Sequence, residues 1–283
     1  NYLWNDRFLS AVNHFGGGEG AYGERAACYI DPEGKGRCSI LRGGTRYFYL
    51  RDGEDVWNPG WYPMKRDLDH YSCSHGLGYT YVKGSRNGLS ASLRVFVGAN
   101  EPAEIWTITL KNDSGSLKTV KSYFVCDFLL EGYSRYSDYN SYVFAEKSGQ
   151  RDLLVFYNEA QERPHPWFDA FLAQSVPLSG FESSRKALFG PYGSMETPEA
   201  IQKGELKNGL AACEKMAGAL EASFSLAPGE SVTYHAILGA CDSMETAEAI
   251  ADVLLADGKI EAEFAALLQR KEELCGEILV STP

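Results

Sequence analysis

The chain has 283 residues, of which 44% are hydrophobic and 23% are charged, so it can bury a large core and is not a disordered polypeptide. Its 27 basic and 38 acidic residues give a formal net charge of −11, and no basic run exceeds two residues. This balance argues against nucleic acid or an acidic membrane surface as a partner. No apolar run approaches the roughly 20 residues that span a bilayer, and no signal peptide is expected.

Cysteine usage predicts a reducing, cytoplasmic setting. The seven cysteines are spread from Cys28 to Cys275 without any C-x-x-C pair, which is typical of buried thiols in a large intracellular chain. The alternative is a disulfide bond between Cys28 and Cys38, with the other five cysteines reduced.

No strand is predicted before the first glycine-rich segment, Gly16–Gly20, and no helix is predicted after it. A phosphate-binding loop needs both, because the helix N-terminus supplies the donors to the phosphate. The segment is therefore predicted to be a flexible turn, and no nucleotide or other cofactor is expected.

Residues 46–81 are the richest in groups that can bind a sugar. Trp57 and Trp61 offer apolar rings to a pyranose, while Arg66 and the neighbouring carboxylates can bind its hydroxyls. In the alternative interpretation these aromatic residues pack a long loop against the fold.

Two histidines in the same segment are also candidate binding residues. His70-x-x-Cys73-x-His75 contains three side chains that ligate zinc, but the spacing fits no closed tetrahedral site and no second pair follows. No metal is predicted. His70 and His75 remain candidates for contact with a carbohydrate.

Apolar residues at every second position predict strands through most of the chain. Leu89, Leu93 and Val97 lie on one face of a run that alternates with polar residues, and Asn87-Gly88 marks a hairpin turn before it. Similar alternation occurs at 106–110 and 124–128. Further strands are expected at 142–146, 152–157, 220–226 and 231–238, and many short strands of this kind are typical of a sandwich.

Residues 131–142 combine four tyrosines with short polar side chains. Such segments make good contact surfaces because tyrosine loses little conformational entropy on binding; a solvated connection between strands is the alternative. The candidate binding residues here are Tyr133, Arg135, Tyr136, Asp138, Tyr139 and Asn140.

The pattern changes after Ala240. Ser243 can cap a helix in which Met244, Ala247 and Ile250 recur at helical spacing, and Asp257-Gly258 ends it. A second apolar stripe follows. We therefore expect helices over 243–257 and 260–275, after a single antiparallel β domain over 1–240.

In order along the chain, these motifs resemble those of glycoside hydrolase family 94, the inverting cellobiose phosphorylases and their relatives. The resemblance is densest at 49–61, at Asp69-His70-Tyr71 and at 75–79. It begins at 1–3 and 8–10 and continues through shorter matches at 87–89, 96–97, 104–112, 185–190 and 228–239, so it covers nearly the whole chain.

The resemblance implies a β-supersandwich, a fold also used by galactose mutarotases, over 1–240, and the start of a helical linker over 241–283. It implies that a catalytic barrel of paired helices lies beyond Pro283 in the same polypeptide and holds the general acid and the phosphate-binding groups. In such enzymes phosphate attacks the anomeric carbon while one carboxylic acid protonates the leaving oxygen.

The resemblance also implies a homodimer in which a loop at 132–142 lies at the edge of the partner's sugar site and contacts a β-linked oligosaccharide. Cellobiose phosphorylases tend to carry Asn, Asp and Gln in this loop, so its tyrosines argue against cellobiose as the substrate. The function implied for this chain is that of a non-catalytic scaffold and dimer-interface domain, within a phosphorylase or a cyclic-glucan synthase.

Two functions of other classes remain open. The chain can be a stand-alone carbohydrate-binding module that uses Trp57 and Trp61. It can also be a mutarotase-like aldose epimerase that uses His70, His75 and a carboxylate, although this reading depends on fold analogy alone.

Overall fold

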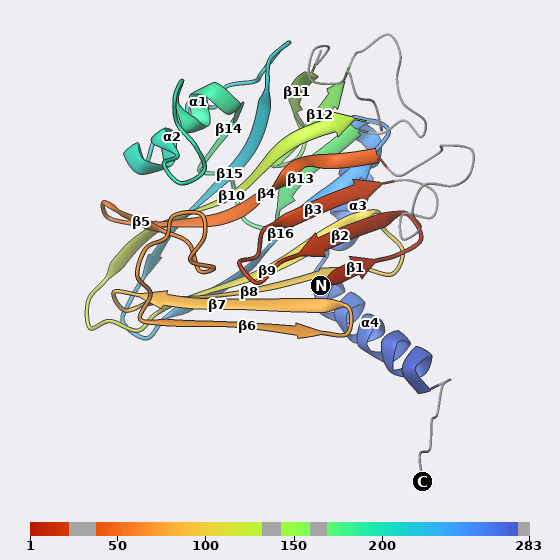
Figure 1. Cartoon of the computed structure of the whole chain (residues 1–283), viewed down its shortest axis with the longest axis horizontal. Coiled ribbons are helices and arrows are strands. Elements are labelled where there is room, and N and C mark those ends of the chain that lie inside the picture. Colours follow the sequence, from red (N-terminus) through yellow and green to blue (C-terminus); the bar gives the residue numbers. More distant parts are fainter. Residues whose placement is uncertain (23–37, 132–142, 159–168, 277–283) are drawn as a thin grey trace.

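Two antiparallel β-sheets face each other and make up most of the molecule (Figure 1). The structure, a computed structural model, describes residues 1–22, 38–131, 143–158 and 169–276. Every pairing between the described strands is antiparallel, as the sequence predicts.

The first sheet, called sheet A, has eight strands. Seven follow one another across the sheet as β1 (Tyr2–Trp4), β2 (Phe8–Val12), β3 (Gly18–Tyr22), β4 (Cys38–Asp52), β10 (Lys118–Glu131), β15 (Met216–Leu226) and β14 (Gly180–Ser184). The eighth strand, β5 (Asp55–Trp57), pairs with β4 through a short hairpin that sets Trp57 opposite Leu50.

The second sheet, called sheet B, also has eight strands. Their order is β11 (Val143–Lys147), β12 (Leu153–Asn158), β13 (Asp169–Gln174), β16 (Ser231–Cys241), β9 (Ala103–Asn112), β8 (Leu89–Val97), β7 (Tyr79–Arg86) and β6 (His70–Gly76). The strands predicted from alternation at 89–97, 106–110, 124–128, 142–146, 152–157, 220–226 and 231–238 are all present.

The main core lies between the two sheets. It contains the inward-facing residues of both, among them Trp57, Trp106, Phe124 and Phe156, all 1% exposed or less. The alternation of β8 stops after Leu93, because from Arg94 onward the outer face of that strand is also buried. Helices provide this second covering layer.

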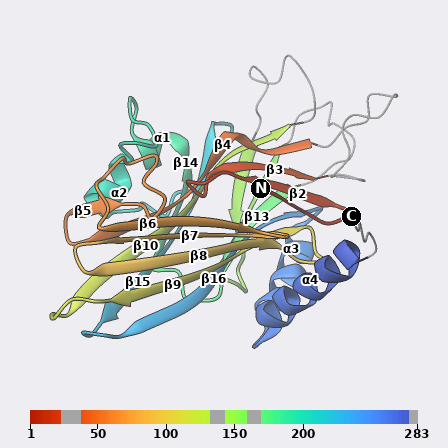
Figure 2. The ribbon, with the colours of Figure 1, turned by 60° about the horizontal axis from the view of Figure 1, so that its bottom comes forward.

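Two helices cover part of the outer face of sheet B, where Figure 2 shows them beside the strands. They are α3 (Met244–Leu254) and α4 (Lys259–Gly276), close to the predicted ranges. Ser243 caps α3 by accepting a hydrogen bond from the backbone N–H of Thr246. No helix in the described part of the chain is long and apolar enough to cross a membrane.

Two short helices cover part of the outer face of sheet A and were not predicted from the sequence. They are α1 (Arg185–Phe189) and α2 (Glu199–Lys203), each only five residues long, too short to show a helical period. Phe189 and Ile201 pack with Tyr49 and Tyr123 of the sheet.

An ion pair is completely buried between the sheets. Arg46 of β4 and Glu104 of β9 are both 0% exposed, and Nε of the arginine lies 2.8 Å from Oε1 of the carboxylate. The terminal guanidinium nitrogens donate to the carbonyl oxygens of Glu19 and Ala11, while Glu104 accepts hydrogen bonds from Ser10 and Trp106. The pair therefore links β2 and β3 to sheet B.

Candidate functional site

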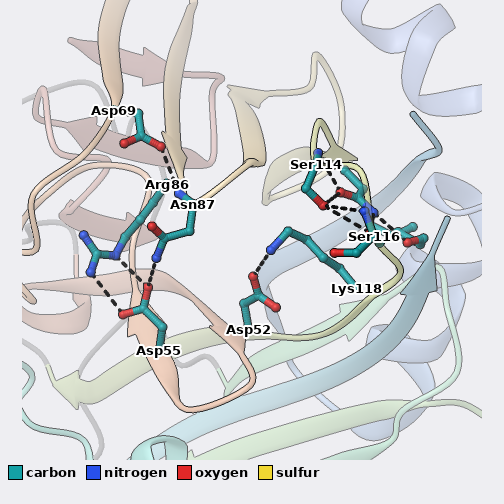
Figure 3. A network of polar contacts seen from close by, with 10 residues as sticks. Asp52, Asp55, Asp69, Arg86, Asn87, Ser114, Ser116 and Lys118 are labelled. Atoms are coloured by element: carbon teal, nitrogen blue, oxygen red, sulfur yellow. Dashed lines mark hydrogen bonds and ion pairs between the residues drawn. The ribbon is translucent and has the colours of Figure 1, made fainter. Parts of the chain in front are cut away.

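A network of polar contacts fixes both ends of the long loop that follows β5 (Figure 3). Nε of Arg86 donates to Asp55 at 2.7 Å and a terminal nitrogen of the same guanidinium donates to the carbonyl oxygen of Asp67 at 2.5 Å. The next residue, Asn87, donates its backbone N–H to Asp69 and its side-chain amide to Asp55. The hydrogen bond that Arg86 donates to Asp55 is the main cause of the raised pKa of Arg86.

Close backbone contacts hold the middle of the loop. Asn58 is 2% exposed; its side-chain amide donates to the carbonyl oxygen of Tyr62, and its side-chain oxygen accepts from Met64 N–H. A Cβ at Gly60 would lie 2.0 Å from the carbonyl oxygen of Phe15, so only glycine fits here. The loop and the turn at 13–17 therefore form one packed unit.

The glycine run at 16–20 is thus a tightly packed element and not the flexible turn that its composition suggests. A Cβ at Gly17 would lie 2.8 Å from the ring of Tyr47, and one at Gly18 would lie 1.7 Å from the carbonyl oxygen of Ala11. Residues from Gly18 onward belong to β3. The glycines allow this segment to approach its neighbours closely.

Trp61 projects from the loop in an unusual backbone conformation. Its φ is +69° and that of Lys65 is +55°, in the left-handed region, which costs a non-glycine residue roughly 1–2 kcal/mol. The backbone N–H of Lys65 donates to the carbonyl oxygen of Trp61 at 2.6 Å and helps to hold this turn. The Trp61 side chain nevertheless remains 39% exposed.

Four aromatic side chains from three segments that are distant along the chain are linked by contacts on this surface. We call these residues, Tyr71, His14, Phe15 and Trp61, the aromatic row. The hydroxyl of Tyr71 donates to the carbonyl oxygen of His14 at 2.5 Å. Ring centroids of His14 and Phe15 are 3.8 Å apart, and those of Phe15 and Trp61 are 5.8 Å apart. Tyr71 is 42% exposed, so the two end members both present rings to solvent.

The inner side of the row is anchored in the covering layer of sheet A. Tyr62 packs on Phe15 at 5.6 Å and on Tyr47 at 5.8 Å between centroids. Burial, together with the neighbouring Tyr62 and Glu196, raises the pKa of Tyr47 to about 12. The Tyr47 phenol is therefore a neutral support for the row at ordinary pH.

The structure separates the candidates that lie close together in the sequence. Trp57 is 1% exposed in the main core, so its ring cannot contact a sugar, which agrees with the packing interpretation for this residue. Trp61 and Arg66 are exposed on the loop. Because side chains alternate along β6, His70 and His75 point to opposite faces of sheet B and cannot form one acid–base pair.

His75 lies in a small polar cluster at the inner side of β6. Its Nδ1 is 3.0 Å from the hydroxyl of Thr80, and its Nε2 is 3.7 Å from the sulfur of Cys73. Burial, the N-terminal ammonium group and His14 lower the pKa of His75, which favours a neutral imidazole. Across the ranges that the structure describes, no three His, Cys, Asp or Glu side chains group around a possible metal position.

His70 lies instead at an open depression of about 540 Å³ on the outer face of sheet B. The depression is lined mainly by short hydroxyl side chains of β6, β7, β8 and β9, with lysines at positions 83 and 111. Lys111 is paired with Asp113, and Nζ of Lys83 lies 5.5 Å from the centroid of the Tyr81 ring.

Several predicted groups fall outside the described residues. These are the tyrosine-rich residues Tyr133, Arg135, Tyr136, Asp138, Tyr139 and Asn140, and Cys28 of the alternative Cys28–Cys38 bridge. Among the described cysteines, Cys73, Cys126, Cys213, Cys241 and Cys275 are free thiols.

Sequence reasoning missed His14, Phe15 and Tyr71 as members of one surface. They come together only because the turn at 13–17, the loop after β5 and strand β6 meet in space. The local signal was Gly60, whose place between two aromatic residues marks a close approach of another backbone.

Two facing antiparallel sheets with helices on their outer faces define a supersandwich domain, and comparisons with known proteins agree. Residues 1–255 match the family model described as "Glycosyl hydrolase 94, supersandwich domain". The chain therefore belongs to glycoside hydrolase family 94, as the motifs indicate.

Several curated relatives of the chain are phosphorylases. The chain is 54% identical to solabiose phosphorylase of Paenibacillus borealis over all of its own length and 37% of that protein. It is 27% identical to N,N′-diacetylchitobiose phosphorylase of Vibrio proteolyticus, again over its whole length and 36% of the relative. The chain thus spans about a third of these relatives.

Solved structures show the same fold at low sequence identity. A bacterial glucoamylase complexed with acarbose has a TM-score of 0.66 at 13% identity, over 96% of this chain and 35% of that one. A polysaccharide lyase has a TM-score of 0.50 at 10% identity, over 85% of this chain and 33% of that one.

Proposed function

We propose that this chain is the non-catalytic N-terminal scaffold and dimer-interface domain of an inverting glycoside phosphorylase. The observation that carries the proposal is the alignment of the whole chain with only about a third of each phosphorylase relative. The partners are then a catalytic helical barrel of the same polypeptide, a homodimer partner and a β-linked oligosaccharide.

The fold supports a scaffold role for this chain. Its main core is buried between the sheets. The inward-facing charged residues Arg46 and Glu104 form an ion pair with each other. The 54% identity to solabiose phosphorylase makes solabiose the first substrate to test.

The complete polypeptide should release a sugar 1-phosphate from solabiose and inorganic phosphate, whereas the 283-residue chain alone should release none. The reason is that the proposed acid and phosphate-binding groups belong to the barrel. Sugar 1-phosphate release, followed by a coupled assay, measures both. Turnover by the chain alone that a substitution within it abolishes would contradict the proposal.

Substitutions in the tyrosine-rich segment test the interface role. In the complete protein, Asp138→Ala and Tyr139→Ala should each raise the KM for the acceptor sugar several-fold, because one hydrogen bond typically contributes about 0.5–1.5 kcal/mol. Asp257→Ala and Tyr192→Ala, at exposed positions elsewhere, are matched controls and should leave KM unchanged. A variant in this segment with a much lower melting temperature but the wild-type KM would show that the segment only stabilises the structure.

A further inference from the structure

Trp61 is the one residue of its loop whose large apolar ring is exposed to solvent. The surrounding residues Trp57, Pro63 and Met64 are buried, yet the Trp61 ring is 39% exposed and its backbone is held in the left-handed region. Strained conformations of this kind persist where the surrounding structure fixes them and concentrate at binding sites. The hydrogen bonds of Asn58 and Lys65 provide that fixation.

The exposed ring is also supported from behind. Phe15 lies between Trp61 and Tyr62, and the close contact of Gly60 with the backbone of Phe15 prevents the two segments from sliding apart. Tyr71, at the other end of the aromatic row, is fixed through its hydrogen bond to His14. Two exposed rings are thus presented on one rigid surface before any ligand arrives.

The loop that carries Trp61 also carries exposed polar side chains. Lys65, Arg66 and Asp67 follow Trp61 in the same loop and are exposed, and Nζ of Lys65 lies 5.5 Å from the centroid of the Tyr62 ring. An aromatic platform with donors and acceptors of both charges at its rim suits a ligand that has flat apolar faces and many hydroxyls. A pyranose has both, whereas an acyl chain would leave the charged rim unpaired.

We propose that the aromatic row is an oligosaccharide-binding surface, with Trp61 and Tyr71 as its two platforms. Two separate platforms suit a chain of linked pyranoses more than a single sugar. Binding here does not depend on the phosphorylase function proposed above, because it needs neither the barrel nor residues 132–142.

Affinity electrophoresis of the 283-residue chain in gels that contain soluble β-glucan tests the proposal. The wild-type chain should be retarded, and Trp61→Ala should weaken the apparent affinity about tenfold or more. Tyr71→Ala should weaken it less, and Trp61→Phe should keep part of it. Tyr192→Ala is the matched control, since Tyr192 is completely exposed but lies outside the row; it should migrate as the wild type.

Parallel gels with soluble α-glucan distinguish the linkage. Retardation in the α-glucan gel would still support a saccharide site and would assign it to α-linked chains. Migration of the wild type unchanged in both gels would overturn the proposal, as would equal losses for Trp61→Ala and Tyr192→Ala. Thermal melting of each variant separates loss of the platform from loss of the fold.

Discussion

Replacing Arg46 with methionine should lower the free energy of unfolding by about 3–5 kcal/mol, because it leaves the Glu104 carboxylate buried without its counter-charge. The same change removes the donors to the carbonyl oxygens of Ala11 and Glu19, which link β2 and β3 to the core. Urea denaturation at neutral pH measures the loss, and the midpoint of thermal melting should fall by roughly 10 °C.

The double variant Arg46→Met/Glu104→Gln is the control for this result. Once both charges are absent, no buried charge is unpaired, so the double variant should lose less stability than the sum of the two single variants. Additive losses would show that the two side chains are not coupled, contrary to their 2.8 Å contact.

Replacing Trp57 with alanine should destabilise the fold by about 3–5 kcal/mol, because the ring is 1% exposed and its removal leaves a large cavity in the main core. Trp61→Ala, four residues further on, should change stability by less than about 1 kcal/mol, since its ring is partly in water. Equilibrium unfolding of the two variants side by side gives the comparison.

This pair of tryptophans also checks the site. Loss of saccharide binding in Trp57→Ala should be accompanied by early melting, whereas loss in Trp61→Ala should occur at the wild-type melting temperature. Equal destabilisation by the two substitutions would mean that the loop does not present Trp61 as described.

Strands were predictable because their signal is local. The alternation of Leu89, Leu93 and Val97 marks one face of β8, and the cap at Ser243 marks the start of α3. The inward position of Arg46 also had a local signal, since it shares the parity of Phe48 and Leu50 in β4. A buried arginine is so rare that pattern alone does not favour it.

The site was less predictable because it depends on contacts between distant segments. Trp57 and Trp61 are equivalent as residues in a motif, but only the pairing of β5 with β4 sends one into the core. The aromatic row joins residues up to 57 positions apart through a hydrogen bond between Tyr71 and His14. Neither fact follows from spacing along the chain.

The docking of α4 on sheet B has a mechanical consequence. Phe264 lies 5.2 Å from Phe96 and 5.3 Å from Tyr79 between centroids, and Arg94 pairs with Glu261, so the first half of the helix is clamped. From Leu268 to Gly276 no residue is buried, although Nζ of Lys271 lies 4.3 Å from the centroid of the Trp4 ring. Figure 1 shows this half extending away from the strands.

The 12 residues that follow Phe264, up to Gly276, extend about 18 Å along the helix axis, so this part of the helix acts as a lever arm whose pivot is the clamp. A tilt of about 10° at the pivot would displace the far end by about 3 Å, given that length. Small changes in the packing of Phe264 would thus be amplified into large displacements at Gly276.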